Sequence, residues 1–166
     1  SLLDTCMTGM GSRTLKRWLL EPARDRTQAI ARLDAITTLR GDRGAGPWNT
    51  LRAHLKGTSD VERITARIAL RQARPRELVA LRLTLQKAEH VMAIPRWDGA
   101  FLTDISRDLT PPPGCADLLA GSLLEEPAAL VRDGGVIANG LDTELDELRA
   151  IQTNCDAFLL DLETRE

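Results

Sequence analysis

Hydrophobic side chains recur along most of the chain at intervals of three or four residues, the spacing that gathers them on one face of a helix. Leu15, Trp18 and Leu19 form one such stripe, in a helix that Ser12 is expected to cap and Pro22 to stop. Helices are predicted over residues 12–20, 27–39, 60–73, 75–94, 101–109 and 115–124, with a glycine-rich loop over 41–47. The pattern predicts an all-α fold.

The helix predicted over residues 75–94 carries a heptad-like seam for two repeats. Pro75 suits its first turn and Pro95 ends it. The seam consists of Leu78, Leu81, Leu85, Ala88 and Met92. Ser59 or Asp60 would cap the helix before it. Together these helices predict a bundle that occupies about residues 1–130.

A glycine-rich turn over residues 131–140 separates this bundle from the end of the chain. Gly134 and Gly135 supply backbone freedom for a turn, and Asn139-Gly140 is a second turn signal. Between these turns, residues 136–138 predict a short apolar extended segment. We expect this segment to form the structural base of the helix that follows.

The last helix, within residues 141–166, is predicted to begin at its N-cap Asp142. Its seam steps by four and three residues over roughly 36 Å, through Leu141, Leu145, Leu148, Gln152, Cys155, Leu159 and Leu162. We interpret it as a rigid rod whose seam packs on partners, with Cys155 in a core. Because the chain starts at Ser1 and no stop signal follows this helix, we expect a segment of a longer protein. In that isolated segment, residues 155–162 would expose apolar side chains.

The composition fits a globular protein, with 43% hydrophobic and 28% charged residues. A formal net charge of −2 excludes a global field that draws the chain to nucleic acid. None of the three cysteines is part of a CxxC pair and their number is odd, which argues against a disulfide framework or a zinc site and favours a reducing compartment. No apolar run is long enough to span a membrane, and we expect a cytoplasmic location.

The sequence lacks the patterns of catalytic and cofactor sites. No GxxxxGK[ST] motif is present to hold a nucleotide phosphate, and His54 and His90 have no partner at metal-ligand spacing. Paired acids such as Asp142 and Asp146 are better explained by helix capping. We therefore predict no catalytic residue, no cofactor and no metal site in this chain, which is not expected to be an enzyme by itself.

One charge pattern stands out in the helix predicted over residues 60–73. Arg63, Arg67, Arg71 and Arg74 recur at intervals of four, four and three, and would line one side of that helix. These four arginines are candidate phosphate contacts. The interpretation we favour is that they pair with carboxylates on neighbouring helices, including the last helix, because the net charge is near zero and no aromatic residues interleave.

Three stretches resemble the MutS family of DNA mismatch-repair proteins. The first covers residues 1–25, with Met10-Gly11-Ser12-Arg13 and Arg17-Trp18-Leu19. The second is DVERITARIALRQARPREL, residues 60–78, and the third is VRDGGVIANGLDTELDELR, residues 131–149. Their order and spacing also match, and the resemblance covers essentially the whole chain. The matching region is the core, or lever, domain of that family.

The resemblance implies that residues 1–166 form one helical core domain, placed between a connector domain and the clamp that embraces DNA. The parent protein would bind mismatched duplex DNA as a homodimer on the nucleoid and hydrolyse ATP with Mg²⁺ in a separate ATPase domain. The chain itself would be a non-catalytic structural and transducing module. Two alternatives stay open: a stand-alone helical module that binds DNA through its arginines, or an oligomerisation module that uses the seam of residues 141–162.

Overall fold

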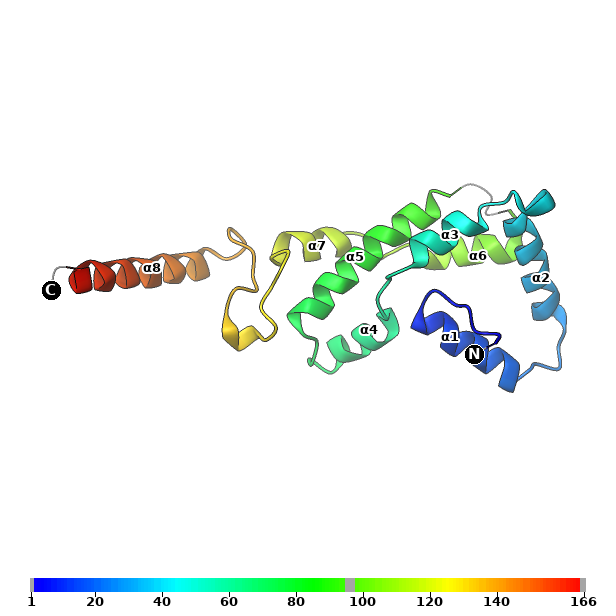
Figure 1. The fold of residues 1–166 in the computed structure, drawn as a ribbon, viewed down its shortest axis with the longest axis horizontal. Coiled ribbons are helices and arrows are strands. Elements are labelled where there is room, and N and C mark those ends of the chain that lie inside the picture. Colours follow the sequence, from blue (N-terminus) through cyan, green and yellow to red (C-terminus); the bar gives the residue numbers. More distant parts are fainter. Residues whose placement is uncertain (1, 95–97, 165–166) are drawn as a thin grey trace.

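The computed structural model describes the backbone of residues 2–94 and 98–164, and side chains within these ranges up to Cys155. The structure is 65% helical, with eight α-helices and no strand among the described residues, which confirms the predicted all-α fold. The helices are α1 (Gly9–Leu20), α2 (Thr27–Arg40), α3 (Trp48–Leu55), α4 (Val61–Ala69), α5 (Pro75–Met92), α6 (Ala100–Leu109), α7 (Cys115–Ser122) and α8 (Thr143–Thr164) (Figure 1). Short 3-10 helices, η1 (Asp42–Gly44) and η2 (Val131–Asp133), lie in two of the connections.

Helix α5 is the centre of the helical body. Helices α3, α4, α6 and α7 all contact it, and α2 contacts α6. Its buried side chains include Val79, Leu81 and Val91. Pro75 occupies the first turn as predicted, and every position of the predicted seam is at least partly buried. Hydrophobic periodicity therefore located the longest helix of the body and the face that it buries.

Helix α1 begins at Gly9, three residues before the predicted start. Its N-cap is Thr8, whose Oγ1 accepts a hydrogen bond from the Gly11 amide at 3.0 Å. The expectation that Ser12 caps this helix was wrong, because Ser12 already lies within it and donates its hydroxyl to Asp4 Oδ1 at 3.1 Å. The helix ends at Leu20, before Pro22, as predicted.

The connection between α2 and α3 depends on a close backbone approach at Gly46. A Cβ atom at this position would collide with the backbone of Leu39 and Arg40. The Gly46 amide instead donates to the Arg40 carbonyl at 2.7 Å, which reverses the chain directly after α2. The predicted loop over residues 41–47 is confirmed apart from η1 within it, whereas α3 was not predicted.

Helix α4 is shorter than predicted, because it ends at Ala69 and not at Ala73. Arg71 adopts a left-handed backbone conformation, with φ at 55°. Its amide donates to the Ile68 carbonyl at 2.9 Å, and the Gln72 amide donates to the Arg67 carbonyl at 2.8 Å. These two bonds form a Schellman motif, in which glycine is the usual left-handed residue. An arginine in this position gives no sequence signal for the helix end.

After α7 the chain loops out and returns, so that residues 136–138 pair with residues 122–124 before α8 begins. Leu123 and Ile137 form an isolated antiparallel bridge, which confirms the predicted extended segment over residues 136–138. The three turn glycines, Gly134, Gly135 and Gly140, have φ values of 73°, 60° and 83°. From this base α8 projects away from the body as a single straight helix (Figure 1).

The seam of α8 is largely exposed as far as its side chains are described. Leu141 and Leu148 are 49% and 57% exposed. Cys155 is also exposed, so its predicted place in a core was wrong. Figure 1 shows that α8 extends away from the other helices. The side chains of residues 156–162, which we expected to be exposed, lie outside the described residues. Among the helices that the structure describes, none is long and apolar enough to cross a membrane.

Candidate coupling site at the base of the last helix

Asp142 caps α8, as the sequence predicts. Its Oδ1 accepts a hydrogen bond from the Leu145 amide at 3.1 Å, and its carbonyl accepts from the Asp146 amide at 3.0 Å. The cap satisfies amides that the first turn of a helix cannot satisfy internally. Glu144 and Asp146 place further negative charge in the first turn, where the helix dipole favours it.

Arg149 ties the second turn of α8 to the extended segment below it. Its Nη2 donates to the Ile137 carbonyl at 3.0 Å, and its Nη1 donates to Asn139 Oδ1 at 3.0 Å and Asp146 Oδ1 at 3.3 Å. The other carboxylate oxygen of Asp146 accepts from the Gly140 amide at 2.6 Å. We call this set of contacts the base clamp. It fixes the direction in which α8 leaves the turn.

The base clamp is joined to the helical body through the extended segment. The Leu124 amide donates to the Val136 carbonyl at 3.0 Å, and the Ala138 amide donates to the Ser122 carbonyl at 3.0 Å. On the inner side of this pair, Val136 and Leu123 pack with Val79 of α5 in one buried hydrophobic cluster. The contacts therefore run without a break from the central helix to the second turn of α8.

Sequence reasoning found only part of this base. It identified the turn glycines and the cap Asp142, because their signals are local. It missed Arg149, whose partners at residues 137 and 139 become neighbours only after the chain has turned. The available signal was the spacing of Asp146 and Arg149, three residues apart on a helix directly after an Asn-Gly turn.

A second polar cluster joins α1 to the start of α4. Arg13 of α1 donates from Nη1 and Nη2 to the two Asp60 carboxylate oxygens at 2.6 and 2.9 Å, and from Nη2 to Glu62 Oε2 at 2.6 Å. The guanidinium lowers the pKa of the Asp60 carboxyl below its ordinary value. Asp60 also caps α4, accepting from the Arg63 amide at 3.2 Å. One carboxylate thus starts α4 and holds α1 against it.

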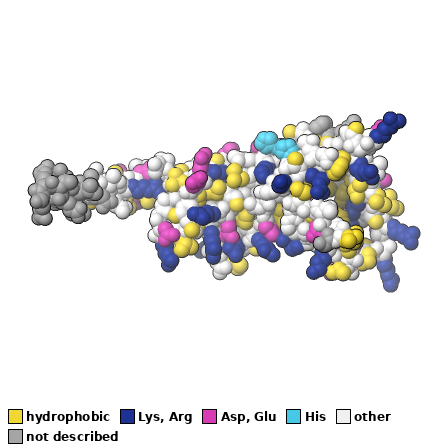
Figure 2. Space-filling model, viewed as in Figure 1, with side chains coloured by type: hydrophobic (Ala, Val, Ile, Leu, Met, Phe, Trp, Pro, Cys, Tyr) yellow, Lys and Arg dark blue, Asp and Glu magenta, His cyan; other side chains and the backbone are white. Residues whose placement is uncertain are grey.

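The four candidate phosphate contacts do not share one helix face. Arg63 and Arg67 lie on α4, whereas Arg71 and Arg74 lie in the connection to α5. Arg67 pairs with Glu77 of α5 at 2.6 Å, and Arg63 contacts Asp60 at 3.4 Å. Among the described side chains, no ion pair forms between these arginines and α8. The expected pairing with carboxylates of the last helix is therefore absent there. Figure 2 shows Lys and Arg side chains gathered along the edge of the body over α4.

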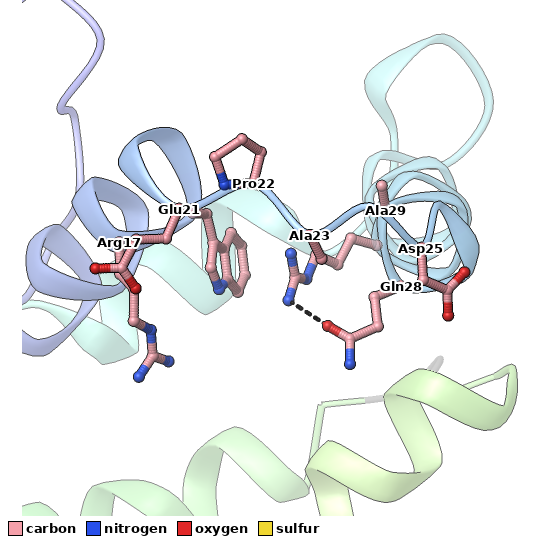
Figure 3. Close-up of a pocket in the computed structure, with 9 residues that line it drawn as sticks. Arg17, Glu21, Pro22, Ala23, Asp25, Gln28 and Ala29 are labelled. Atoms are coloured by element: carbon pink, nitrogen blue, oxygen red, sulfur yellow. Dashed lines mark hydrogen bonds between the residues drawn. The ribbon is translucent and has the colours of Figure 1, made fainter.

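A pocket lies where α1 passes into α2 (Figure 3). The Arg32 guanidinium carbon lies 3.7 Å from the centre of the Trp18 ring, in a cation–π contact, and Arg32 Nη2 donates to Gln28 Oε1 at 3.2 Å. Arg17 and Glu21 line the same pocket, so positive and negative charges are mixed there. These contacts fix the angle between α1 and α2.

The two histidines come together although they are far apart in the sequence. The rings of His54 and His90 stack with centroids 6.1 Å apart, and His90 Nδ1 lies 2.8 Å from the Gln86 carbonyl. In the part of the chain that the structure describes, no group of three or more His, Cys, Asp or Glu residues is arranged to hold a metal ion. The stack joins α3 to α5.

The fold and the base clamp together define a helical core module, in which a body of packed helices holds one long projecting helix at its foot. The family model of MutS domain III matches residues 1–165. The chain therefore belongs to the MutS family of DNA mismatch-repair proteins, of which it is the core domain. This confirms the resemblance of the three sequence stretches, and Arg13 and Arg149, from the first and third of them, prove to be the donors of the two polar clusters.

Proposed function

We propose that this chain is the non-catalytic, transducing core of a MutS-type mismatch-repair ATPase. In this role α8 is a lever that passes movement between the clamp that embraces DNA and the ATPase domain. The observation that carries the proposal is the base clamp, through which Arg149 holds α8 to a segment that is itself packed on α5. A helix held in this way moves with the body as one unit.

In this role the chain works together with other domains of the same protein. Its partners are mismatched duplex DNA, through the whole protein, the connector, clamp and ATPase domains of the same chain, and a second copy in a homodimer. ATP and Mg²⁺ bind in the ATPase domain, and no catalytic step takes place in this segment. Coupling of this kind requires two global arrangements that DNA and nucleotide both bias. We place the protein in the cytoplasm, associated with the nucleoid.

The test is an Arg149→Gln variant of the full-length protein. The substitution removes the hydrogen bonds to Ile137 and Asn139 but keeps the Asp142 cap. Coupling between two sites usually amounts to about 5- to 150-fold. We therefore expect the effect of mismatched duplex on the ATPase rate to shrink by at least about fivefold, while the rate without DNA stays within about twofold of wild type.

A matched control is Arg132→Gln in the same connecting segment. Arg132 is 82% exposed, and its charged partner is the adjacent Asp133, at 3.7 Å. This variant removes the same charge but leaves the base clamp intact, so it should respond to mismatched DNA as wild type does. An undiminished response in Arg149→Gln would refute the proposal. Loss of the ATPase rate measured without DNA would also refute it, because the base clamp would then serve only folding.

A further inference from the structure

We propose that Arg82 of α5 is an anchor for the carboxylate of an Asp or Glu side chain on another segment of the same protein. Arg82 is 9% exposed, and no other charged side chain among the described residues is buried as deeply. It takes no part in the base clamp or in the cluster around Asp60. The inference rests on the proposed function only in that further domains of the same protein pack around this chain.

The guanidinium of Arg82 has no partner in the part of the chain that the structure describes. No ion pair and no hydrogen bond joins it to a described residue. Its own helix cannot supply a partner, because no acid stands three or four residues away, where side chains of one helix face meet. These positions are Leu78, Val79, Leu85 and Gln86. Since burial removes water that would solvate a cation, the missing partner costs free energy.

Arg82 stands where the packed face of α5 meets solvent. One turn before it, Val79 packs with Leu123 in the buried cluster, whereas one turn after it Gln86 is exposed. Among the side chains that the structure describes, the only fully buried nitrogen or oxygen atom without a hydrogen-bond partner is Nε of Arg32. The unpaired nitrogens of Arg82 therefore reach solvent, so its stem is buried and its tip is accessible. A group from outside the helical body can bind this tip without unfolding α5.

The chemistry of the partner follows from the other arginines that join two helices of this fold. Arg13 holds α1 to the cap of α4 through Asp60, and Arg67 holds α4 to α5 through Glu77, each at 2.6 Å. A carboxylate matches the planar guanidinium in both charge and shape, and can accept two of its hydrogen bonds. Because the matching family model describes a domain numbered III, further domains of the same protein are the nearest source of such a carboxylate.

The experiment measures hydrogen-exchange protection of the α5 amides in the full-length protein. Arg82→Met removes the charge and Arg82→Lys keeps it, while both shorten the side chain. If a carboxylate binds Arg82, the Met variant leaves that carboxylate without its partner. We expect protection around residue 82 to fall by about 10- to 100-fold for Arg82→Met, the range of a hydrogen bond to a charged group, and by clearly less for Arg82→Lys.

Gln86→Met is the matched control, because Gln86 lies one turn further along the same face and is exposed. It should change protection by no more than about twofold. Equal losses in Arg82→Met and Arg82→Lys would overturn the proposal, because lost packing alone would then explain both. Higher protection in Arg82→Met would also overturn it, since Arg82 would then be unpaired in the whole protein.

Exchange of chloride for inorganic phosphate at equal ionic strength separates the two sources of an anion. With a protein carboxylate at Arg82, the protection of wild-type α5 should not depend on phosphate. Protection that rises with phosphate in wild type but not in Arg82→Met would assign the site to a free anion and overturn the proposal. The lever proposal is read from the ATPase response of Arg149→Gln, so either proposal can fail without the other.

Discussion

Arg13 shows, at the scale of single residues, how one side chain can hold two distant segments together. Its guanidinium binds both oxygens of Asp60, 47 residues away, and Glu62 as well. Paired hydrogen bonds between a guanidinium and a carboxylate are stronger and more directional than single ones. Arg13 belongs to the first stretch that resembles the MutS family, and the contact explains what an arginine contributes there.

The Asp60 carboxylate gives a prediction for the dependence of stability on pH. The pKa of Asp60 is lowered in the folded protein. Its contribution to stability is therefore present above the unfolded pKa of 3.8 and is lost as the pH falls through the lower folded pKa. Asp60→Asn keeps a good N-cap but removes the ion pair. We expect this variant to be less stable than wild type at pH 7, with the difference shrinking towards about pH 3.

Urea unfolding of the two proteins at both pH values measures that difference. A variant that changes only surface charge, Asp108→Asn, serves as the control, because Asp108 is 79% exposed and contacts Arg107 only at 4.0 Å. A stability difference between Asp60→Asn and wild type that does not change between pH 7 and pH 3 would contradict the assignment.

Residue-level signals were readable from the sequence where they were local. Asp142 was predicted as a cap and Asp60 was one of two candidates with Ser59, because capping depends on a few neighbouring amides. The partners of Arg13 and Arg149 were not, because they depend on the completed fold. Cys155 was misplaced because a seam position on a helix shows which face is apolar but not whether anything covers it.

At the scale of elements, the hydrophobic cluster between α5 and the extended segment holds in place the segment to which Arg149 of α8 is hydrogen-bonded. Leu123 is 6% exposed and packs with Val79 and Val136. Leu123→Ala would remove a buried side chain and leave a cavity, which usually costs about 2 to 5 kcal/mol of unfolding free energy. We expect a loss in this range by denaturant unfolding. Leu118→Ala in α7 is the control, because Leu118 is 67% exposed and its truncation should lower the unfolding free energy far less.

A loss in Leu123→Ala no larger than in the control would mean that the cluster does not stabilise the segment.

Helix boundaries, like single residues, could be predicted from the sequence only where the signal was local. Helix α5 was predicted well because its seam is regular, and α4 was overextended because Arg71 replaces the glycine that would have marked its end. Helix α3 was missed because its eight residues lie next to a glycine-rich loop and show no long periodic stripe.

At the scale of the whole molecule, the described apolar surface is unevenly covered. Ile30, Leu33 and Ile36 of α2 are 56%, 62% and 51% exposed, and the first two turns of α8 project their seam into solvent. Exposed apolar stripes of this kind mark surfaces that pack on other parts of a protein. The spacing predicted the helices that carry these stripes, but not what covers the stripes.

The exposed seam leads to a prediction for the 166-residue chain alone. Because the described side chains of α8 beyond Arg149 form no hydrogen bond or ion pair with the body, we expect the amides from Ala150 onward to show low hydrogen-exchange protection, in contrast to those of α5. Sedimentation at several concentrations, run in parallel, shows whether the chain is a monomer. Full protection from Ala150 onward in a strict monomer would contradict the idea that the seam needs partners. Protection that appears only on self-association would support the oligomerisation alternative.

The geometry of α8 makes it a cantilever. Its 22 residues span about 33 Å, whereas the supports from Asp142 to Arg149 cover only about 10 Å. A sideways load at the tip is therefore balanced by reactions roughly three times larger at the supports. By the same proportion, about 5° of slack at the foot would move the tip by about 3 Å. Tolerances at a few hydrogen bonds near the foot would thus set the positional accuracy of everything attached to the far end.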